Sequence, residues 1–565
     1  MMEPFERIDI QELPLRVPSV RRQVEDFLVS NGLRLEDVDL YRAVLGRDGR
    51  ILAGGGLRRD VIKCVAVSES ARSAGLSAPL ISRLISEAAQ RGYTNVKVYT
   101  KPENRVVFES LGFRLLAAAP KAILMENGRG LEEYCRYLRS HPADAVIVMN
   151  ANPFTLGHQY LLEQAAAILS GDIQSTVPLS IRRAESRRMV VIPVKEDCSR
   201  FPYIARKEMI REGGEGMVDV VEGSDYQISS TTFPTYFLKS LSDAAETQMW
   251  LDIDLFGRHI APALGAKVRF VGSEPNDQLT ARYNAMMKYL LPEYGVQVVE
   301  VPRLCDAEGP VSASRVRACL ANGEFSVASA LTPPSTHPYL KTYLAVRALR
   351  SELDTPLKPG LVGPDGPGAH RDMDYDMMLR SIDAIRPFFP RMGQASSPEE
   401  LRQVGLDAEK AMMTATGRVN THRGAIFAMA LALYPHDIAE TAASLNDGRC
   451  KQREGIRGAM QMALDGYSDL FYRWLPYYQA RKWLPFGKQK TLLLIMSELD
   501  DTCIINRVGY DRAQEVKREA QALREDFSEE KLREMCEQYA AEGISPGGAA
   551  DMLALTIYFE SIEIH

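Results

Sequence analysis

Thr155, Gly157 and His158 form a small group of residues that could act on a nucleotide. They follow the apolar run Ala145 to Met149 and stand where a helical pattern begins. A glycine lets a phosphate lie against the backbone, and hydroxyl and imidazole groups donate hydrogen bonds to the charge that builds up as pyrophosphate leaves. The spacing therefore predicts adenylyl transfer, although a histidine at a helix start can also be a satisfied structural residue.

A second polar group begins at residue 312, at another predicted helix start. Ser312 and Ser314 supply hydroxyls there, and Arg315 and Arg317 supply guanidinium groups. Helix N-termini bind anions, and arginine pairs with phosphate oxygens through charge-assisted hydrogen bonds. Adenylyl transfer needs positioned donors more than a nucleophilic side chain. The residues expected to act in catalysis are Thr155, His158, Ser314 and Arg315.

Further residues are expected to contact ATP because they lie in the same loops or on a nearby predicted helix. Arg206 and Lys207 are cations that could pair with phosphates, or they could belong to the solvated face of a helix. The expected ATP contacts are Asn152, Pro153, Phe154, Gly157, Arg206, Lys207, Ser312 and Arg317.

These groups need a scaffold that brings strand ends together, and the surrounding sequence has the matching pattern. Apolar runs recur between residues 145 and 301 with helical stretches between them. Near-continuous apolar strands separated by helices predict a parallel, doubly wound sheet buried on both faces. The same alternation in residues 1–125 predicts a smaller α/β domain, and the Ala, Leu and Met-rich stretches after residue 339 predict an all-helical unit.

Three segments, together with the two polar groups, resemble the nucleotidyltransferase superfamily and, within it, the citrate lyase ligase family: Asn150–Leu161, Ile228–Lys239 and Val271–Pro275. Thr155–His158 stands where the superfamily has H-x-G-H, and Ser312–Arg317 matches its S-x-S/T-x-x-R. The resemblance implies ATP-dependent activation of acetate as acetyl-adenylate, with loss of pyrophosphate. It also implies acetyl transfer to the thiol of the prosthetic group on the acyl carrier subunit of citrate lyase. The aromatics of Ile228–Lys239 could instead simply fill the core.

The loop Glu69–Ser77 and the segment Phe108–Phe113 resemble GNAT-type acetyltransferases. The R-x-x-G-x-G/A loop of that family implies a CoA-like site at Arg72, Gly75 and Ser77. Ser77 stands where the family has Gly or Ala, so close backbone approach to a pyrophosphate is less assured. An ordinary strand-to-helix turn is the alternative.

Carboxylate, histidine and asparagine side chains recur at predicted helix starts beyond residue 357. Aspartate oxygens in such a cluster can hold Mg²⁺ against a triphosphate. In its order, the series resembles the all-helical triphosphoribosyl-dephospho-coenzyme A synthase family, in which the 2′-hydroxyl of dephospho-coenzyme A displaces adenine from ATP. The matching residues are Lys358, His370, Asp372, Asp374, Asn420, His422, Asp500, Asp501 and Asp551, with Asp372 and Asp374 as the expected metal ligands.

The helical region departs from that family in its middle. Asn446–Gly448 and Arg457–Ala463 stand where a His-Gly-Glu and an R-G-x-R-G-E-A run are expected. The lost Arg and Glu remove a cation and a carboxylate from a nucleotide site. A degenerate domain that only binds dephospho-coenzyme A is therefore an alternative to an active synthase.

Length and composition restrict the class of protein, its compartment and its fold class. The 565 residues carry a formal charge of −6, which predicts neither nucleic-acid nor membrane binding. Eight cysteines without a C-x-x-C pair predict a reduced, cytoplasmic protein. The expected fold class is multidomain: GNAT-like α/β at 1–130, Rossmann-like α/β nucleotidyltransferase at 140–330 and all-α at 340–565, with a proline-rich linker at Leu331–Pro338.

Three functions stay open on the sequence. The first is a bifunctional enzyme of citrate lyase maturation, with ATP and Mg²⁺ as cofactors and with acetate, dephospho-coenzyme A and the acyl carrier subunit as partners. The second is a nucleotidyltransferase that makes a dinucleotide cofactor, since the same motifs serve that chemistry. The third is an adaptor, without enzymatic activity, that docks the carrier.

Overall fold

The computed structural model describes residues 8–174, 188–195, 199–227, 241–275, 277–446 and 456–562. By packing, the chain divides into two compact units. The first unit comprises residues 1–152 and 157–310, and the second comprises residues 153–156 and 311–565. Ile228–Lys239, which carries part of the family resemblance, lies outside the described residues.

The first unit begins with a seven-stranded sheet in the order β1-β2-β3-β4-β5-β7-β6. Its neighbouring strands are antiparallel except for β4 and β5, which run parallel and pair at Val61↔Lys97 and Ile62↔Val98. The strands are β1 Ile10–Glu12, β2 Leu40–Leu45, β3 Ile51–Arg58, β4 Val61–Val67, β5 Val96–Thr100, β6 Arg114–Ala118 and β7 Ile123–Asn127. The helices that accompany them are α1 Pro18–Ser30, α2 Ser77–Gln90, α3 Arg105–Ser110 and α4 Gly130–Arg139.

A second, five-stranded sheet in the same unit is parallel throughout and has the order β10-β9-β8-β11-β12. The strands are β8 Ala145–Met149, β9 Met189–Pro193, β10 Asp219–Val220, β11 Val268–Gly272 and β12 Gln297–Val301. The surrounding helices are α5 Leu156–Ser170, α7 Tyr203–Gly213, α8 Leu241–Leu255, α9 Ala261–Leu264 and α10 Gln278–Leu290. The apolar runs expected to form a parallel sheet do so, because β8 and β9 are buried almost along their whole length.

The strand order reverses at β8. From β8 the chain moves to β9 and β10 on one side and then returns to β11 and β12 on the other. In open α/β sheets, ligands bind outside the carboxyl ends of the strands at such a switch point. The loops that follow β8 and β11 are therefore the place to look for a ligand site.

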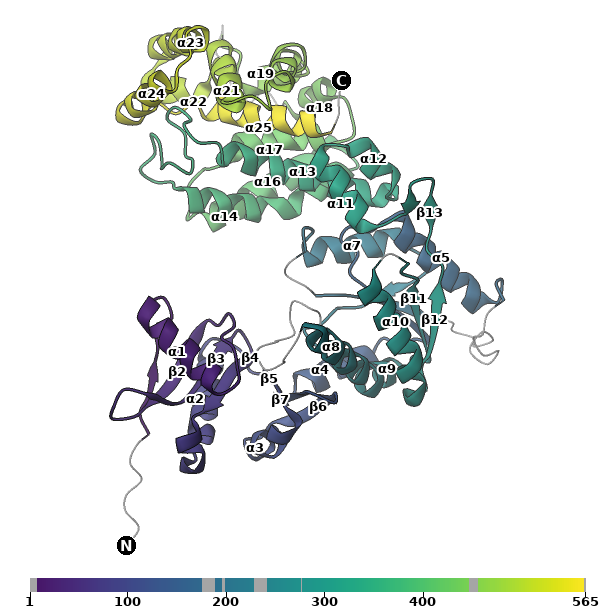
Figure 1. Cartoon of the computed structure of the whole chain (residues 1–565). Helices are drawn as coiled ribbons and strands as arrows, with labels where there is room; N and C mark the ends of the chain where they lie inside the picture. The colour runs from purple at the N-terminus through teal and green to yellow at the C-terminus, as the bar shows by residue number, and fades with distance from the viewer. Residues whose placement is uncertain are drawn as a thin grey trace. The chain divides into compact units, whose positions relative to one another are not determined.

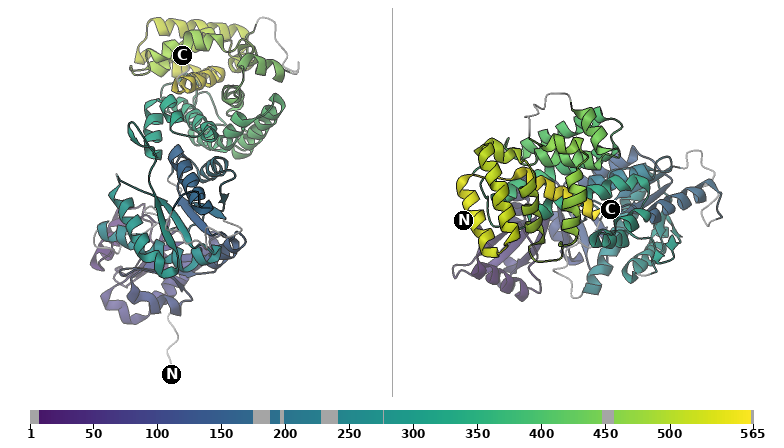
Figure 2. Two further views of the ribbon diagram at one scale, coloured as in Figure 1. Left: turned by 90° about the vertical axis from the view of Figure 1, so that its right-hand side faces the viewer. Right: turned by 90° about the horizontal axis from the view of Figure 1, so that it is seen from above.

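The second unit is helical, as the sequence predicts (Figure 1). Helix α25 Gly547–Ser561 is buried along most of its length and packs against α13, α17 and α21. Its yellow ribbon runs to the C-terminus in Figure 2. The helices are α11 Ala313–Asn322, α12 Phe325–Ala330, α13 His337–Leu353, α14 Tyr375–Ile385, α15 Phe389–Gln394, α16 Pro398–Ala415, α17 Arg423–Leu433, α18 Ile438–Leu445, α19 Ala459–Leu464, α20 Leu475–Gln479, α21 Gly487–Glu498, α22 Thr502–Val508, α23 Tyr510–Glu525, α24 Glu529–Glu542 and α25.

The segment predicted to be a linker is instead packed structure. Leu331, Thr332 and Thr336 are buried, and a short 3-10 turn leads directly into α13. The prediction was wrong because proline is tolerated in the first turn of a helix, where its missing N–H has no partner to lose, and Pro338 lies in the first turn of α13.

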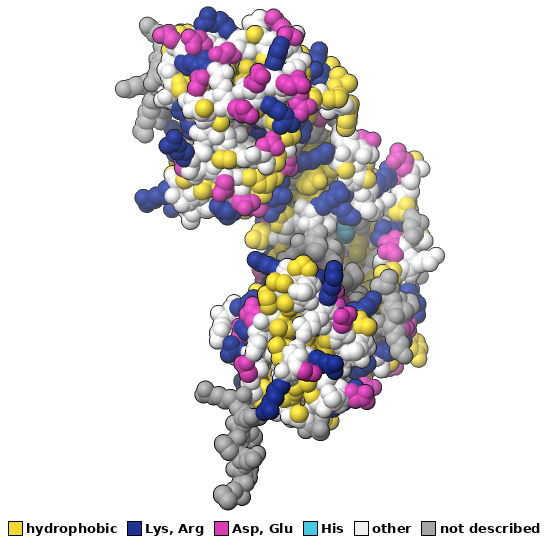
Figure 3. Space-filling model, turned by 60° about the vertical axis from the view of Figure 1, so that its left-hand side comes forward, with side chains coloured by type: hydrophobic (Ala, Val, Ile, Leu, Met, Phe, Trp, Pro, Cys, Tyr) yellow, Lys and Arg dark blue, Asp and Glu magenta, His cyan; other side chains and the backbone are white. Residues whose placement is uncertain are grey.

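Charged side chains of both signs are interspersed on the face that Figure 3 presents. No helix in the described part of the chain is both long and apolar enough to span a membrane.

Candidate functional site

The loop after β8 carries the first predicted motif and is held by polar contacts. The carboxamide of Asn150 accepts hydrogen bonds from Arg206 Nη1 at 2.7 Å and from Ser199 Oγ at 3.4 Å. Asn152 Oδ1 accepts from the backbone N–H of Phe201 at 3.1 Å. These bonds fix the carboxyl end of β8 to the segment that follows β9, so Asn152 has a structural partner at the place where ATP contact is expected.

Arg206 organises this edge of the sheet from inside the protein. Its side chain is 0% exposed and donates to the carbonyls of Phe201, Asn150 and Val194 at 2.7 to 3.0 Å. The interpretation of Arg206 as part of a solvated helix face is therefore wrong, because its guanidinium satisfies backbone acceptors where two strands end. Its neighbour Lys207 forms an ion pair with Glu222.

His158, in the first turn of α5, is held in its neutral form. Burial lowers the pKa of the imidazole to about 4, and the positive charge of Arg303 lowers it further. A neutral imidazole donates one hydrogen bond and accepts another, so His158 can donate to a phosphate oxygen without carrying a charge.

The middle of the motif loop, residues 153–156, belongs to the second unit. Thr155 is buried there. The carbonyl of Phe154 accepts from Thr336 Oγ1 at 3.2 Å, and the N–H of Leu156 donates to the carbonyl of Leu331 at 3.0 Å. The structure thus places Pro153, Phe154 and Thr155 in the second unit, and Asn152, Gly157 and His158 in the first.

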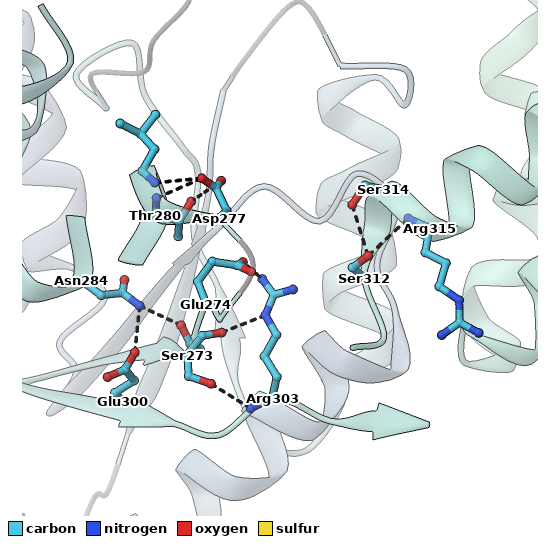
Figure 4. A network of polar contacts seen from close by, with 12 residues as sticks. Ser273, Glu274, Asp277, Thr280, Asn284, Glu300, Arg303, Ser312, Ser314 and Arg315 are labelled. Atoms are coloured by element: carbon cyan, nitrogen blue, oxygen red, sulfur yellow. Dashed lines mark hydrogen bonds and ion pairs between the residues drawn. The ribbon is translucent and has the colours of Figure 1, made fainter. Parts of the chain in front are cut away.

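Ser312 caps the N-terminus of α11, as expected for a hydroxyl at a helix start. Its Oγ accepts from the backbone N–H of Arg315 at 3.3 Å and lies 3.2 Å from Ser314 Oγ (Figure 4). Arg315 and Arg317 follow on the same helix, in the second unit. The two hydroxyls and two guanidinium groups are therefore gathered within the first turns of one helix.

Sequence reasoning assigned no role to a polar network at the ends of β11 and β12, in the first unit. Arg303 Nε donates to the carbonyl of Ser273 at 2.9 Å, and Arg303 Nη2 forms an ion pair with Glu274 (Figure 4). Ser273 and Glu274 directly follow strand β11 at the switch point. They lie in Val271–Pro275, which carries part of the family resemblance, so the sequence marked this segment without assigning a role to either residue.

The CoA-like loop lies beside a cavity between β4 and β5. Gly75 adopts φ 68° at the end of a short 3-10 turn, and Ser77 is the first residue of α2. A cavity of about 560 Å³ is lined by Arg72 and Ser77 and by residues of both strands, among them Val65 and Val98. The structure brings Arg72 and Ser77 to one cavity at the N-terminus of α2.

In the second unit, a cluster of buried charged side chains gathers several predicted residues around α13, α17 and α25. Lys358 forms a buried ion pair with Glu352, which the sequence did not single out. His422 is 4% exposed, and burial, followed by the charge of Lys358, lowers its pKa to about 4. The His422 Nδ1 atom lies 2.7 Å from Ser381 Oγ. No motif marks Glu352, since it lies inside an ordinary helical pattern.

Asp501 and Asp551 are the acidic members of this cluster. Burial raises the pKa of both carboxyl groups, and Asp501 and Glu352 raise that of Asp551 further. Asp501 caps α22 and also accepts from the N–H of Ala549 at 2.9 Å. Asp551 lies against the start of α17, where a Cβ on Gly424 would come within 1.9 Å of its Oδ2. A carboxyl group with a raised pKa is suited to accept a proton near neutral pH.

The remaining predicted residues of the helical unit have other partners. His370 Nε2 lies 2.8 Å from Ser545 Oγ, and its Nδ1 lies 3.1 Å from Arg507 Nη2. His370, Asp372 and Arg507 line a cavity of about 570 Å³. Other local contacts engage Asp374, which caps α14, Asp500, which pairs with Lys517, and Asn420, which accepts from the N–H of Arg423.

Metal ligands were expected at Asp372 and Asp374. Among the described residues, no group of three or more His, Cys, Asp or Glu side chains is arranged to hold a metal ion. Asp374 accepts a hydrogen bond from the N–H of Met377 at 2.7 Å, and Asp372 is exposed. The residues present do not by themselves form a metal cage.

The family departure near residue 457 is visible only in part, since residues 447–455 lie outside the described chain. Arg457 forms ion pairs with Asp465 at 2.7 Å and Asp469 at 3.1 Å, and its N–H donates to Asp500. The guanidinium of Arg457 is therefore paired with two carboxylates at the protein surface.

Comparison with known proteins finds two families along the chain. The model for the citrate lyase ligase C-terminal domain matches residues 144–173 and 179–340. The model for the ATP:dephospho-CoA triphosphoribosyl transferase matches residues 341–445 and 435–565. A crystal structure described as an acyl-CoA N-acyltransferase from Klebsiella pneumoniae is 16% identical and covers 21% of this chain and 94% of its own, with a TM-score of 0.18.

Relatives are found for both parts. A [citrate [pro-3S]-lyase] ligase from Escherichia coli is 38% identical over 335 residues, which span 57% of this chain and 90% of the relative. A Streptococcus mutans protein named as a probable 2-(5''-triphosphoribosyl)-3'-dephosphocoenzyme-A synthase is 32% identical over 283 residues, which span 39% of this chain and 96% of the relative.

Buried polar residues gather around Arg206 in the α/β part and around Asp551 in the helical part. Together with the fold and these matches, they define an enzyme that joins a ligase part to a transferase part. The chain belongs to the citrate lyase ligase family and, in its helical part, to the triphosphoribosyl-dephospho-coenzyme A synthase family.

Proposed function

We propose that the chain is a bifunctional enzyme of citrate lyase maturation. One observation carries the proposal: two families whose reactions use the same prosthetic group occupy one chain, each matched over nearly the full length of a relative. The helical part makes the precursor of the prosthetic group, and the α/β part acetylates the finished group on the acyl carrier subunit. Both families imply ATP as a substrate.

The ligase reaction proceeds in two steps in this proposal. A carboxylate oxygen of acetate attacks the α-phosphorus of ATP, the bond from that phosphorus to the bridging oxygen breaks, and pyrophosphate leaves with the electron pair. The carrier thiolate, whose proton has passed to solvent, then attacks the acetyl carbon. The bond from that carbon to the AMP oxygen breaks and AMP leaves.

The roles of the ligase residues follow from their chemistry. His158 donates a hydrogen bond to a phosphate oxygen as charge builds up, and its neutral form keeps this donor in place across the physiological pH range. Ser314, Arg315 and Arg317 supply donors to phosphates from the start of α11. Arg206 acts as a positioning residue, since its guanidinium holds the loop that contains Asn150.

In the transferase reaction we assign proton acceptance to Asp551. The 2′-hydroxyl oxygen of dephospho-coenzyme A bonds to the anomeric carbon of ATP, and the bond from that carbon to adenine breaks. The hydroxyl proton passes to Asp551 as adenine leaves with the electron pair and takes up a proton from solvent. The raised pKa of Asp551 and its buried position among Glu352, Lys358 and Asp501 support this role.

The seven-stranded sheet offers a place for the CoA-like part of the prosthetic group. Backbone N–H groups at the start of α2, together with Arg72, suit a pyrophosphate at the cavity between β4 and β5. Mg²⁺ at Asp372 and Asp374 stays a prediction that rests on the family resemblance, and no step above depends on it.

The test is pyrophosphate and adenine release by the purified chain. Pyrophosphate release that requires acetate supports the ligase, release that requires a mononucleotide supports a dinucleotide synthase, and no release supports an adaptor. Adenine release that requires dephospho-coenzyme A, and that Asp551→Asn lowers by at least about a hundredfold, supports an active transferase. Binding of dephospho-coenzyme A without adenine release supports the degenerate domain, which the missing Arg and Glu favour.

A further inference from the structure

Three loops of the first unit leave the second sheet at its switch point. The loop after β8 leads to His158, the loop after β11 begins with Ser273 and Glu274, and the loop after β12 contains Arg303. Strands β8, β11 and β12 are neighbours and parallel, so these loops leave the same edge of the sheet. A cation on one of these loops would be close to a ligand that binds at the switch point.

Arg303 is fixed at this edge by contacts with the end of β11. Its backbone N–H donates to Ser273 Oγ at 3.1 Å, its Nε donates to the Ser273 carbonyl at 2.9 Å, and its Nη2 pairs with Glu274. Figure 4 shows the guanidinium turned toward Glu274 and the Ser273 backbone. Three anchors of this kind pre-organise the planar guanidinium before any ligand arrives.

A comparison within the same unit separates this arginine from a structural one. Arg206 is fully buried, and its guanidinium is surrounded by protein acceptors. Arg303 is 31% exposed, whereas its partner Glu274 is only 10% exposed. Among the described residues the contacts of Arg303 use Nε and Nη2, which leaves Nη1 available to a ligand. The carboxylate of Glu274 is therefore covered by protein, while the guanidinium of Arg303 remains accessible to a ligand.

The charge of Arg303 also reaches the groups around it. It helps to lower the pKa of His158 and that of Asp277, the residue that caps α10. His158 and Arg303 also lie on loops that leave the same edge of the sheet, so the imidazole as a neutral donor and the guanidinium as a charged one could serve one ligand.

We infer that Arg303 binds an anionic oxygen of a ligand at the switch point between β8 and β11, and that Glu274 and Ser273 are the residues that position it. The inference rests on the proposed function for the identity of that ligand. The oxygen belongs either to the carboxylate of acetate or to a phosphate of ATP, because both offer the same acceptor to a guanidinium.

Four variants of the full chain test this inference: Arg303→Ala, Arg303→Lys, Glu274→Gln and, as a control, Arg282→Ala. Arg282 also pairs with a glutamate, Glu246, but on the exposed surface of α10. Calorimetry gives the affinity for ATP, and pyrophosphate release gives KM for acetate and kcat. Removal of one charge-assisted contact should weaken the affected ligand by roughly ten- to a hundredfold.

The two sources of the oxygen give different results. A higher Kd for ATP in Arg303→Ala assigns the contact to a phosphate, and a higher KM for acetate with unchanged ATP affinity assigns it to the carboxylate. Arg303→Lys should recover part of the lost affinity, because lysine keeps the positive charge but lacks the paired donors of the planar guanidinium. Glu274→Gln should lose less affinity than Arg303→Ala. Arg282→Ala should match the wild type.

Unchanged ATP affinity, KM and kcat in Arg303→Ala would overturn the inference. If that variant does not fold, Arg303→Lys and Glu274→Gln decide in the same way, since wild-type values in both would overturn it. If the wild type binds ATP but releases no pyrophosphate with acetate, the proposed function fails. The Kd for ATP then decides the inference alone: weaker ATP binding by Arg303→Ala supports it, and an unchanged Kd overturns it.

Discussion

The hydroxyl of Thr336 donates a hydrogen bond to the carbonyl of Phe154, 182 residues earlier in the chain, at 3.2 Å. Both groups are buried, and a second bond from Leu156 to Leu331 lies beside this one. The loop that carries Thr155 is thus held by the segment that leads into the first long helix of the transferase part. This relationship ties the position of a ligase residue to the packing of that segment.

Thr336→Val should test whether this hydrogen bond positions Thr155. Valine keeps the volume but leaves the Phe154 carbonyl without its donor, at a cost of about 1 kcal/mol in the free energy of unfolding. Acetate-dependent pyrophosphate release should fall roughly tenfold as Thr155 loses its fixed position. Thr414→Val is the matched control, since that hydroxyl donates to a carbonyl within its own exposed helix. Equal rates in the two variants would show that the hydrogen bond between Thr336 and Phe154 has no role in the reaction.

His158→Ala should lower acetate-dependent pyrophosphate release by about a hundredfold or more, because it removes a pre-organised donor to transition-state charge. The fold should survive, as circular dichroism can check. His141→Ala, which alters a histidine at the end of α4, should keep the wild-type rate. Since the pKa of His158 is about 4, the wild-type rate should show no histidine inflection near pH 6.5. A normally folded His158→Ala variant with full rate would remove His158 from the site.

Arg206→Ala should destabilise the first unit by about 3 kcal/mol or more, because several buried acceptors lose a charged donor at once. The measurement is denaturant unfolding monitored by circular dichroism. Arg211→Ala on the same helix removes an exposed ion pair and should change stability by less than about 0.5 kcal/mol. Similar losses in both variants would contradict the structural role of Arg206.

The contribution of His422 to the stability of the helical unit should fall as the pH falls from about 6.5 to 4, whereas the raised pKa of Asp501 and Asp551 acts in the opposite direction. His422 has a pKa of about 4 in the folded state, below the ordinary value of 6.5. Over this range the unfolded chain takes up a proton and the folded one does not, so protonation favours unfolding, by up to about 3 kcal/mol. Hydrogen exchange of α17 at several pH values measures the effect.

Between about pH 6.5 and 4, His422→Gln should therefore lose less stability than the wild type, and His436→Gln, at an exposed position, should match the wild type. An identical pH profile in His422→Gln and the wild type would show that another group is responsible.

The sequence predicted the strands of the second sheet well, because a buried parallel strand such as β9 needs apolar residues on both faces. It also placed Ser312 correctly at a helix start. It could not predict that Arg206 is buried, since that depends on acceptors from Asn150 and Val194 that only the folded chain brings together. Glu352 and Arg303 were missed for the same reason: their partners Lys358 and Glu274 become neighbours only through packing.

The central claim is that this chain acetylates the citrate lyase carrier at the expense of ATP. The direct measurement is the intact mass of the purified acyl carrier subunit, bearing its thiol prosthetic group, after incubation with the chain, ATP and acetate. We predict that the carrier gains one acetyl group, that the gain needs both ATP and acetate, and that AMP and pyrophosphate appear in equal amounts. A carrier of unchanged mass, from a chain that binds ATP normally, would contradict the account.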